Sequence, residues 1–215
     1  RHPEIGQMKP FVTLTAVAVP FDNVNMDTDQ ILPARYLRKP RGPDYHTYLL
    51  HDLRYTEDGG ERGDFILNQQ PYRQARIIVG NRNFGCGSSR EAAVFALDAN
   101  DIRAVIAPSF GDIFHNNCFK NGVLPIRLDE ASCAALRAQL HENPGAEMIV
   151  DLEARRITAP NGATHEFEVS EFRRRCLMQG LDDIGLTLEH EEAMNTFEAD
   201  YRREMSWLYP EQRES

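Results

Sequence analysis

The sequence predicts a single α/β domain followed by a helical C-terminal tail. Short apolar runs alternate with segments of helical composition, which is typical of parallel strands joined by helices. A glycine-rich turn, NFGCGSSRE (83–91), leads from one such run into a helix. Near the C-terminus, apolar residues recur at helical spacing from Leu188 to about Trp207. With 215 residues the chain is long enough to bury a substantial core.

The first third of the chain predicts one strand and two irregular segments. FVTLTAVAVP (11–20) alternates in the way that favours a strand, and the polar segment after it (21–33) is rich in Asx side chains that form local turns. Residues 38–64 carry many proline, glycine and charged residues, so we expect a long excursion with one short helix. We interpret residues 1–10 as an upstream extension or a remnant of the expression vector.

The centre of the chain predicts a strand, a glycine turn, a helix and a second strand. ARIIVG (75–80) and IRAVIAP (102–108) are the two buried strands. A helix between them predicts parallel strands with a right-handed crossover. The S-S-R-E at 88–91 is a capping-box pattern, which predicts Ser88 as the N-cap and Glu91 as its reciprocal partner.

The second half predicts helices around a β-meander and then the tail. The elements expected are a short helix ending at Asn121-Gly122, a strand at 123–128, a helix at 129–145, a meander at 148–169 with a turn at Asn161-Gly162, and a helix at 170–180. We therefore place the domain at 11–187 and the helical tail at 188–215. The apolar stripe of the tail, which includes Met194 and Phe197, is interpreted as a packing surface rather than a cofactor site.

The composition argues against several kinds of partner. A formal net charge of −9 disfavours nucleic acid or an anionic membrane. No apolar run approaches the roughly 18 residues of a spanning helix, and no secretory signal is visible, so we expect a cytoplasmic protein. The cysteines Cys86, Cys118, Cys133 and Cys176 are spaced too irregularly for a metal site, and we expect four reduced, mostly buried thiols.

The glycine-rich turn is the main candidate for a functional site. A strand that leads through glycines into a helix N-terminus can bind an anion, because free N–H groups and the helix dipole meet there. A phosphate loop would need Lys and Ser/Thr where Cys86-Gly87 stands, and the GxSxG of a hydrolase is absent. A third hypothesis makes Ser88 a base beside a carboxylate held by Arg90. The alternative is an ordinary capped helix.

Four separated motifs resemble one enzyme family. NVNMDTDQILPARYL, NFGCGSSRE, IRAVIAPSFGDIF and NGVLPI occur in the family's order and are similar to the small subunit of 3-isopropylmalate dehydratase, of the aconitase superfamily. The later stretch FRRRCLMQGLDDIGLTLEHEEAM resembles the family's C-terminal region, so the resemblance covers Phe11 to about Glu198. It implies the swivelling β/β/α domain of aconitase as a separate polypeptide.

The resemblance also implies a reaction and a partner. The family enzyme isomerises 2-isopropylmalate and 3-isopropylmalate through isopropylmaleate, a step of leucine biosynthesis. A [4Fe–4S] cluster on a large subunit would act as the Lewis acid on the hydroxyl of this dicarboxylic acid. This chain would then bind no cofactor and would be active only with the large subunit.

The family's functional residues fall on matching positions of this sequence. The resemblance makes Ser88 the base that takes the carbon-bound proton, and it assigns Ser89 and Arg90 to the substrate carboxylate and the alkoxide. Further substrate contacts are expected at Thr28, Asp29, Arg35, Arg38 and Gly87. A solvated side chain is an equal alternative for Arg38, and a pair of Asx turns is the alternative for Asp27–Asp29.

One departure from the family pattern bears on the substrate. Family members commonly read SSREHAPWAL, whereas this chain has Ala92 in place of histidine and Val94-Phe95 in place of Pro-Trp. Because this turn is expected next to the substrate, another 2-alkylmalate such as citramalate or dimethylmalate is one alternative. A non-catalytic carboxylate-binding module is the other, and dicarboxylate binding by the isolated chain without any activity would favour it.

Overall fold

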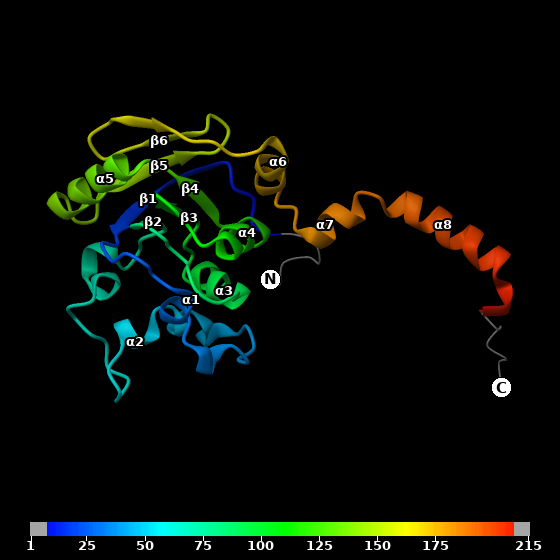
Figure 1. Cartoon of the computed structure of the whole chain (residues 1–215), viewed down its shortest axis with the longest axis horizontal. Helices are drawn as coiled ribbons and strands as arrows, with labels where there is room; N and C mark the ends of the chain where they lie inside the picture. Colours follow the sequence, from blue (N-terminus) through cyan, green and yellow to red (C-terminus); the bar gives the residue numbers. More distant parts are fainter. Residues whose placement is uncertain (1–7, 209–215) are drawn as a thin grey trace.

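A seven-stranded sheet runs through the computed structural model, which describes residues 8–208 (Figure 1). Its strands are β1 (Thr13–Pro20), β2 (Ile77–Val79), β3 (Ala104–Ala107), β4 (Leu124–Arg127), β5 (Glu147–Asp151), β6 (Arg156–Thr158) and β7 (Thr164–Glu166). The spatial order is β4-β3-β2-β1-β5-β6-β7. β1 to β4 are parallel, and β5 to β7 extend the sheet as an antiparallel meander. The predicted parallel strands and meander are confirmed.

Helices connect the strands and form the C-terminal tail. The α-helices described are α1 (Thr28–Ile31), α2 (His51–Arg54), α3 (Glu91–Ala99), α4 (Asp112–Lys120), α5 (Glu130–Glu142), α6 (Glu171–Gln179), α7 (Asp183–Leu188) and α8 (Glu191–Glu204). Short 3-10 helices are η1 (Ala34–Tyr36), η2 (Pro43–Tyr48), η3 (Ile66–Asn68), η4 (Gln70–Tyr72) and η5 (Ser206–Leu208). The excursion at 38–64 contains α2 as its one short α-helix, as predicted.

The parallel strands are buried on both faces. Every residue of β2 and β3 is buried, which explains why these strands read as continuous apolar runs. Alternate residues enter two separate cores: Ile78 and Val105 pack with the residues around α1 and α3, whereas Ile77 and Ile106 pack on the side of α5. The sheet is therefore a rigid middle layer, and the loops that leave its edge are held at both ends.

Several helix ends follow from local sequence signals. Asp129 caps α5 by accepting from the Ser132 N–H, and Ser170 caps α6 by accepting from the Arg173 N–H. Gly180 ends α6 in the left-handed conformation with φ +71°. These boundaries confirm the predicted helices.

The helix after the glycine turn begins later than predicted. α3 starts at Glu91 and its N-cap is Arg90, so the expected capping box between Ser88 and Glu91 is wrong. Gly87 has φ +92° and Arg90 is extended, which keeps residues 88–90 out of the helix. The Glu91 carboxylate instead accepts from the Asn121 side chain at 2.9 Å.

The tail forms the predicted helix but does not pack on the body. No residue of α8 is buried, and Figure 1 shows α7 and α8 extending away from the sheet beyond α6. The outermost parts of the predicted N-terminal extension (1–7) and of the tail (209–215) lie outside the described residues. Within residues 8–208, every helix is too short or too polar to cross a membrane.

Candidate active site

Two loops meet at the edge of the sheet where β1 and β2 end. Neighbouring parallel strands end at the same edge, which is where α/β folds bind ligands. The Gly85 N–H donates to the Met26 carbonyl at 2.7 Å, and the Thr28 N–H donates to the Cys86 carbonyl at 2.9 Å. Asp27 and Cys86 thus pair as residues of a parallel sheet do. The structure brings the DTD and GSSR segments side by side.

Ser88 is fixed by its main chain and leaves its hydroxyl free. The buried Thr28 donates its hydroxyl to the Ser88 carbonyl at 2.8 Å. Ser88 and Ser89 are exposed, and neither hydroxyl forms a hydrogen bond with another described residue. Thr28 is thus buried and bonded to the main chain of Ser88, and the substrate contact expected of it from the sequence stays a prediction.

Arg90 lies between the two loops and is paired with Asp29. The Arg90 Nη2 and Asp29 Oδ2 atoms are 2.7 Å apart, and Nη1 contacts the other carboxylate oxygen, so the pair is bidentate. Nη1 also donates to the Leu32 carbonyl at 3.4 Å. The Arg90 side chain is 12% exposed and that of Asp29 is 55% exposed. In this structure the partner of Asp29 is therefore Arg90, which it neutralises and orients.

The turn requires glycine at two positions. Gly85 has φ +70°, and a Cβ there would overlap the Phe114 ring. Gly87 has φ +92° and lies against Asp27 and Thr28, where a Cβ would be in ordinary contact. Conformation demands glycine at both positions, and space demands it only at Gly85.

The DTD segment is shaped by a capping box that the sequence reasoning missed. Asp27 caps α1: its side chain accepts from the Gln30 N–H at 2.7 Å, while the Asp27 N–H donates to the Gln30 side chain at 3.1 Å. The signal is the D-T-D-Q at 27–30, which fits the capping-box spacing with Asp as the cap.

The start of α3 faces these loops without a side-chain cap. Arg90, its N-cap, makes no side-chain hydrogen bond to the first turn. A helix start of this kind satisfies its N–H groups with water or with an anionic ligand. Ser88 and Ser89 directly precede it, so a carboxylate bound here would lie beside two free hydroxyls.

Comparisons with known proteins identify the family. Residues 8–131 match the aconitase C-terminal domain, 134–171 match LeuD_N, and 183–211 match the C-terminal domain of the 3-isopropylmalate dehydratase small subunit. The 3-isopropylmalate dehydratase small subunit of Gluconacetobacter diazotrophicus is 49% identical over 200 residues, which cover 93% of this chain and 97% of that relative. The chain belongs to the family of 3-isopropylmalate dehydratase small subunits. The relative from Rhodospirillum centenum, 50% identical over 93% of this chain and 98% of its own, carries the same name.

A solved 3-isopropylmalate dehydratase structure shares the fold. The protein from Methanocaldococcus jannaschii matches with a TM-score of 0.62 and 26% identity, over 86% of this chain and 98% of that one. The predicted α/β fold of the aconitase swivel domain is confirmed, and so is the resemblance on which it was based.

The structure does not bring every residue predicted from the 3-isopropylmalate dehydratase family into the two loops. Arg35 follows α1 and pairs with Asp52 of α2 at 3.0 Å between Nη1 and Oδ2. The hydrogen bonds from Arg35 hold the pKa of Asp52 below its usual value. Arg38 is exposed and forms no hydrogen bond or ion pair with another described residue.

The residues that depart from the family's SSREHAPWAL pattern pack in or against the hydrophobic core. Val94 is fully buried and packs in the cluster around α3. Phe95 is half-buried, and the Arg41 guanidinium lies 4.1 Å from its ring centre. Val94 and Phe95 therefore pack against the core from α3, and Ala92, in the first turn of α3, is half-buried against the same core.

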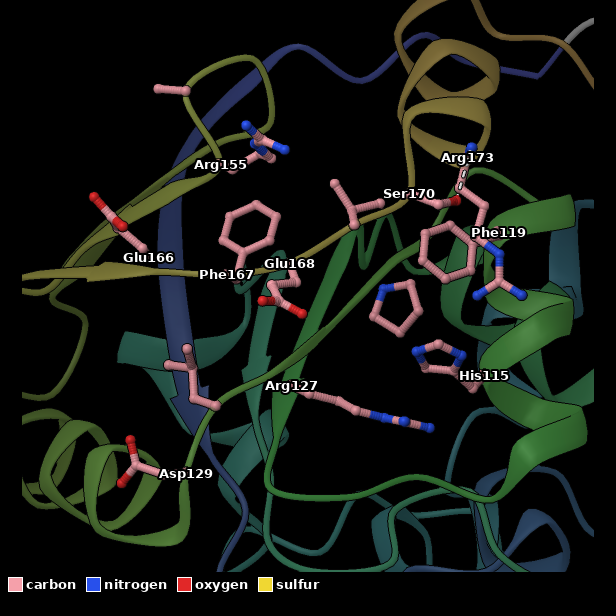
Figure 2. Close-up of a pocket in the computed structure, with 14 residues that line it drawn as sticks. His115, Phe119, Arg127, Asp129, Arg155, Glu166, Phe167, Glu168, Ser170 and Arg173 are labelled. Carbon is pink, nitrogen blue, oxygen red and sulfur yellow. Dashed lines mark hydrogen bonds between the residues drawn. The ribbon is translucent and has the colours of Figure 1, made fainter.

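Two cavities of the described residues lie away from the predicted site residues. One, of about 1300 Å³, is lined by the meander, α4 and α6, and Figure 2 shows Arg127 extending toward His115 across it. Burial lowers the pKa of His115 to about 4, and the charges of Arg127 and Arg173 add to the shift. None of the predicted site residues lines this cavity. Gly87, Ser88 and Ser89 of the glycine-rich turn are exposed at the surface.

The cysteines are free and dispersed. Cys118, Cys133 and Cys176 are buried, Cys86 is half-buried, and none forms a disulfide, which confirms the predicted thiols. Burial raises the pKa of Cys133 to about 11, so that thiol is protonated at neutral pH. Among residues 8–208, no three His, Cys, Asp or Glu side chains are grouped so that they could hold a metal ion.

Proposed function

We propose that this chain supplies the base and the carboxylate-binding residues of 3-isopropylmalate dehydratase, a hydro-lyase of leucine biosynthesis. The observation that carries the proposal is the exposed hydroxyl of Ser88. Thr28 fixes the main chain of Ser88, which lies two residues before Arg90, the N-cap of α3, whose first turn has no side-chain cap. The substrate is a dicarboxylic acid, and this edge concentrates donors suited to a carboxylate.

Ser88 takes up and returns the proton of the reaction. In the dehydration, the Ser88 alkoxide takes a proton from the carbon next to the one that carries the hydroxyl, and the hydroxyl departs as hydroxide, so that the substrate loses the elements of water. Rehydration returns both to exchanged positions. A serine alkoxide is unstable in water at neutral pH, but the Arg90 guanidinium and nearby N–H donors stabilise negative charge at Ser88.

Arg90 binds a substrate carboxylate while it stays anchored by Asp29. A guanidinium has five N–H donors, and Asp29 engages two of its nitrogens from one side. The remaining donors, together with the Ser89 hydroxyl and the amide of Gly87, are left for the substrate. Asp29 is thus a positioning residue. Arg38, which follows η1, is the cation that could pair with a second carboxylate, and Arg35 would contact the substrate only by leaving its pair with Asp52.

The site is completed by a large subunit. The relatives are named small subunits, and the open surface around Ser88 fits a site shared between two chains. The [4Fe–4S] cluster, whose iron supplies Lewis-acid chemistry, belongs on the large subunit, because the described residues of this chain offer no set of ligands for it. We place the assembled enzyme in the cytoplasm.

The test is the variant Ser88→Ala in the complex assembled anaerobically with its large subunit. Loss of the base should lower kcat by about 10²- to 10⁴-fold, while assembly is unchanged. Ser170→Ala is the matched control, because it removes an exposed serine hydroxyl far along the chain; it should cost about 1 kcal/mol of stability through the lost α6 cap and leave kcat unchanged. Unchanged turnover in Ser88→Ala would remove the serine as the base. Assays with citramalate beside 2-isopropylmalate decide the substrate.

A further inference from the structure

Two arginines that line the cavity of Figure 2 have no close carboxylate partner. Among residues 8–208, the carboxylate nearest to Arg127 is that of the exposed Asp112, with 4.0 Å between Nη2 and Oδ1. Arg173 donates to the Asn116 side chain at 2.6 Å and lies 4.5 Å from the centre of the Phe119 ring, but it forms no ion pair with another described residue. Most arginines of this acidic chain pair with a carboxylate, so these two are exceptions.

The two guanidinium groups converge on His115. Figure 2 shows Arg127 reaching toward His115 from the end of β4 and Arg173 approaching it from the first turn of α6. Burial lowers the pKa of His115 to about 4, and the charges of Arg127 and Arg173 lower it further, while Asp112 on the same helix opposes the shift. The imidazole is therefore neutral at pH 7 and keeps one N–H donor. We call Arg127, Arg173 and His115 the arginine corner.

The acidic residues that line the cavity do not neutralise the arginine corner. Asp129 caps α5, and Figure 2 shows its carboxylate and that of Glu166 lying away from His115. Glu168 lies on the side of the meander and forms no hydrogen bond or ion pair with another described residue. Two guanidinium groups without a counter-ion repel each other, so an anion placed between them is stabilised by both charges.

Apolar side chains lie beside the arginine corner. Phe119 of α4, Phe167 and Val169 line the same cavity and belong to the core on the α5 side of the sheet or pack against it. Figure 2 shows the Phe119 ring next to His115. An apolar group attached to a bound anion would therefore leave water for a hydrocarbon wall. The cavity volume of about 1300 Å³ leaves room for a small organic molecule.

We infer that this cavity binds a small organic acid with one carboxylate, held between Arg127 and Arg173, and with an apolar body that packs against Phe119 and Val169. Guanidinium groups bind carboxylates through paired N–H···O bonds, which makes arginine suited to this role. The charge of Glu168 across the cavity disfavours ligands with a second negative charge. The inference does not depend on the proposed function, because none of these residues belongs to the DTD or GSSR segments.

The test uses 4-methylpentanoate, a branched monocarboxylate, titrated into the full chain at pH 7 and followed by NMR. Its amide has the same apolar body without the charge, and sulfate has two charges without the body. Arg127→Gln with Arg173→Gln removes both guanidinium groups. Arg62→Gln with Arg156→Gln makes the same change in net charge at two exposed arginines that do not line the cavity, and it is the matched control.

The wild type and the control should bind 4-methylpentanoate equally well. The Arg127→Gln/Arg173→Gln variant should bind it at least about tenfold more weakly, because two charge-assisted contacts are lost. The amide and sulfate should bind to the wild type at least about tenfold more weakly than the acid. Equal affinities of the two double variants would overturn the inference, and so would an amide or a sulfate that binds as tightly as the acid.

The titration of His115 gives a second measure that needs no variant. A carboxylate bound between the arginines stabilises the imidazolium form, so saturating 4-methylpentanoate should raise the pKa of His115 above about 4. The ring-proton resonances of His115 report this change. A pKa that stays the same would show that the acid does not occupy the arginine corner. Ser88→Ala should bind the acid like the wild type, so failure of the proposed function would leave this result unaffected.

Discussion

Arg90 is the most enclosed of the three residues predicted to be catalytic. A guanidinium with a side chain only 12% exposed needs a partner, because the cost of removing it from water must be offset. Asp29 supplies that partner across 61 positions of sequence, and the bidentate geometry fixes the plane of the guanidinium. The DTD segment therefore fixes the position of Arg90 through Asp29.

Asp29→Asn should lower kcat/KM of the assembled enzyme by about 10- to 100-fold, because an amide neither neutralises Arg90 nor holds its plane. Steady-state kinetics with 2-isopropylmalate measure the effect. Glu61→Gln is the control, since it weakens an exposed ion pair with Arg73 that lies outside the site, and it should leave kcat/KM unchanged. A wild-type rate in Asp29→Asn would show that Arg90 is positioned without it.

At the scale of elements, the glycine turn is a packed structure and not a flexible loop. Its main chain is bonded to the loop after β1 at Gly85, and it passes close to Phe114 on α4. Its left-handed residues are imposed by that packing. The turn is therefore sensitive to a single added methyl group at the tight position.

Gly85→Ala should destabilise the chain by about 3 kcal/mol or more, because it combines a φ of +70° with an overlap against the Phe114 ring. Gly162→Ala carries a similar backbone penalty, at φ +84°, in a hairpin turn with open space around it. It should cost only about 1 kcal/mol. Urea unfolding of both variants measures the difference in unfolding free energy. Equal losses of unfolding free energy would show that the Phe114 ring moves to accommodate the added methyl group.

Most elements could be predicted from the sequence, because their signals are local. Strands followed from apolar runs, and Asp129, Ser170 and Gly180 mark helix ends in plain view. The capping box at Ser88 was wrong because the same S-x-x-E letters serve an extended segment once Gly87 takes a positive φ. A local sequence pattern cannot reveal that a loop distant in sequence, which includes Thr28, holds residues 88–90 in an extended conformation.

The side-chain pairs of the site were beyond sequence reasoning for the same reason. Arg90 and Asp29 are recognisable as charged residues in two motifs, but only the parallel pairing of β1 with β2 brings them together. The sequence likewise offers no sign that Arg35 would turn to Asp52 or that Thr28 would be buried. The sequence names the two motifs as candidates for the site, and the structure adds which of their side chains pair with each other.

At the scale of the whole molecule, a densely packed sheet is followed by a C-terminal helix, α8, that lies apart from it (Figure 1). The sheet has buried cores on both faces, whereas α8 has no buried residue. We therefore expect local unfolding of α8 to cost less free energy than unfolding of the sheet.

Hydrogen exchange of the isolated chain should show this difference directly. Amides of β1, β2 and β3 should exchange only through global unfolding, while those of α8 should exchange at least about 100-fold faster. Mass spectrometry of peptides from the two regions makes the measurement, and α6 serves as an internal control because it is helical and packed. Protection of the α8 amides equal to that of the α6 amides would show that α8 packs against the rest of the chain in solution.

The pairing of Asp27 with Cys86 limits which changes in strand register the chain can tolerate. Beyond the ends of β1 and β2, the isolated bridge between Asp27 and Cys86 keeps the register of the two strands in the loops of the candidate site. A slip of one residue between these strands would carry the serine about 3.3 Å from its place, roughly the length of a hydrogen bond. Ala18, Val19 and Ile77, buried within the sheet, therefore fix the register that sets the position of Ser88 relative to the Asp27–Asp29 segment.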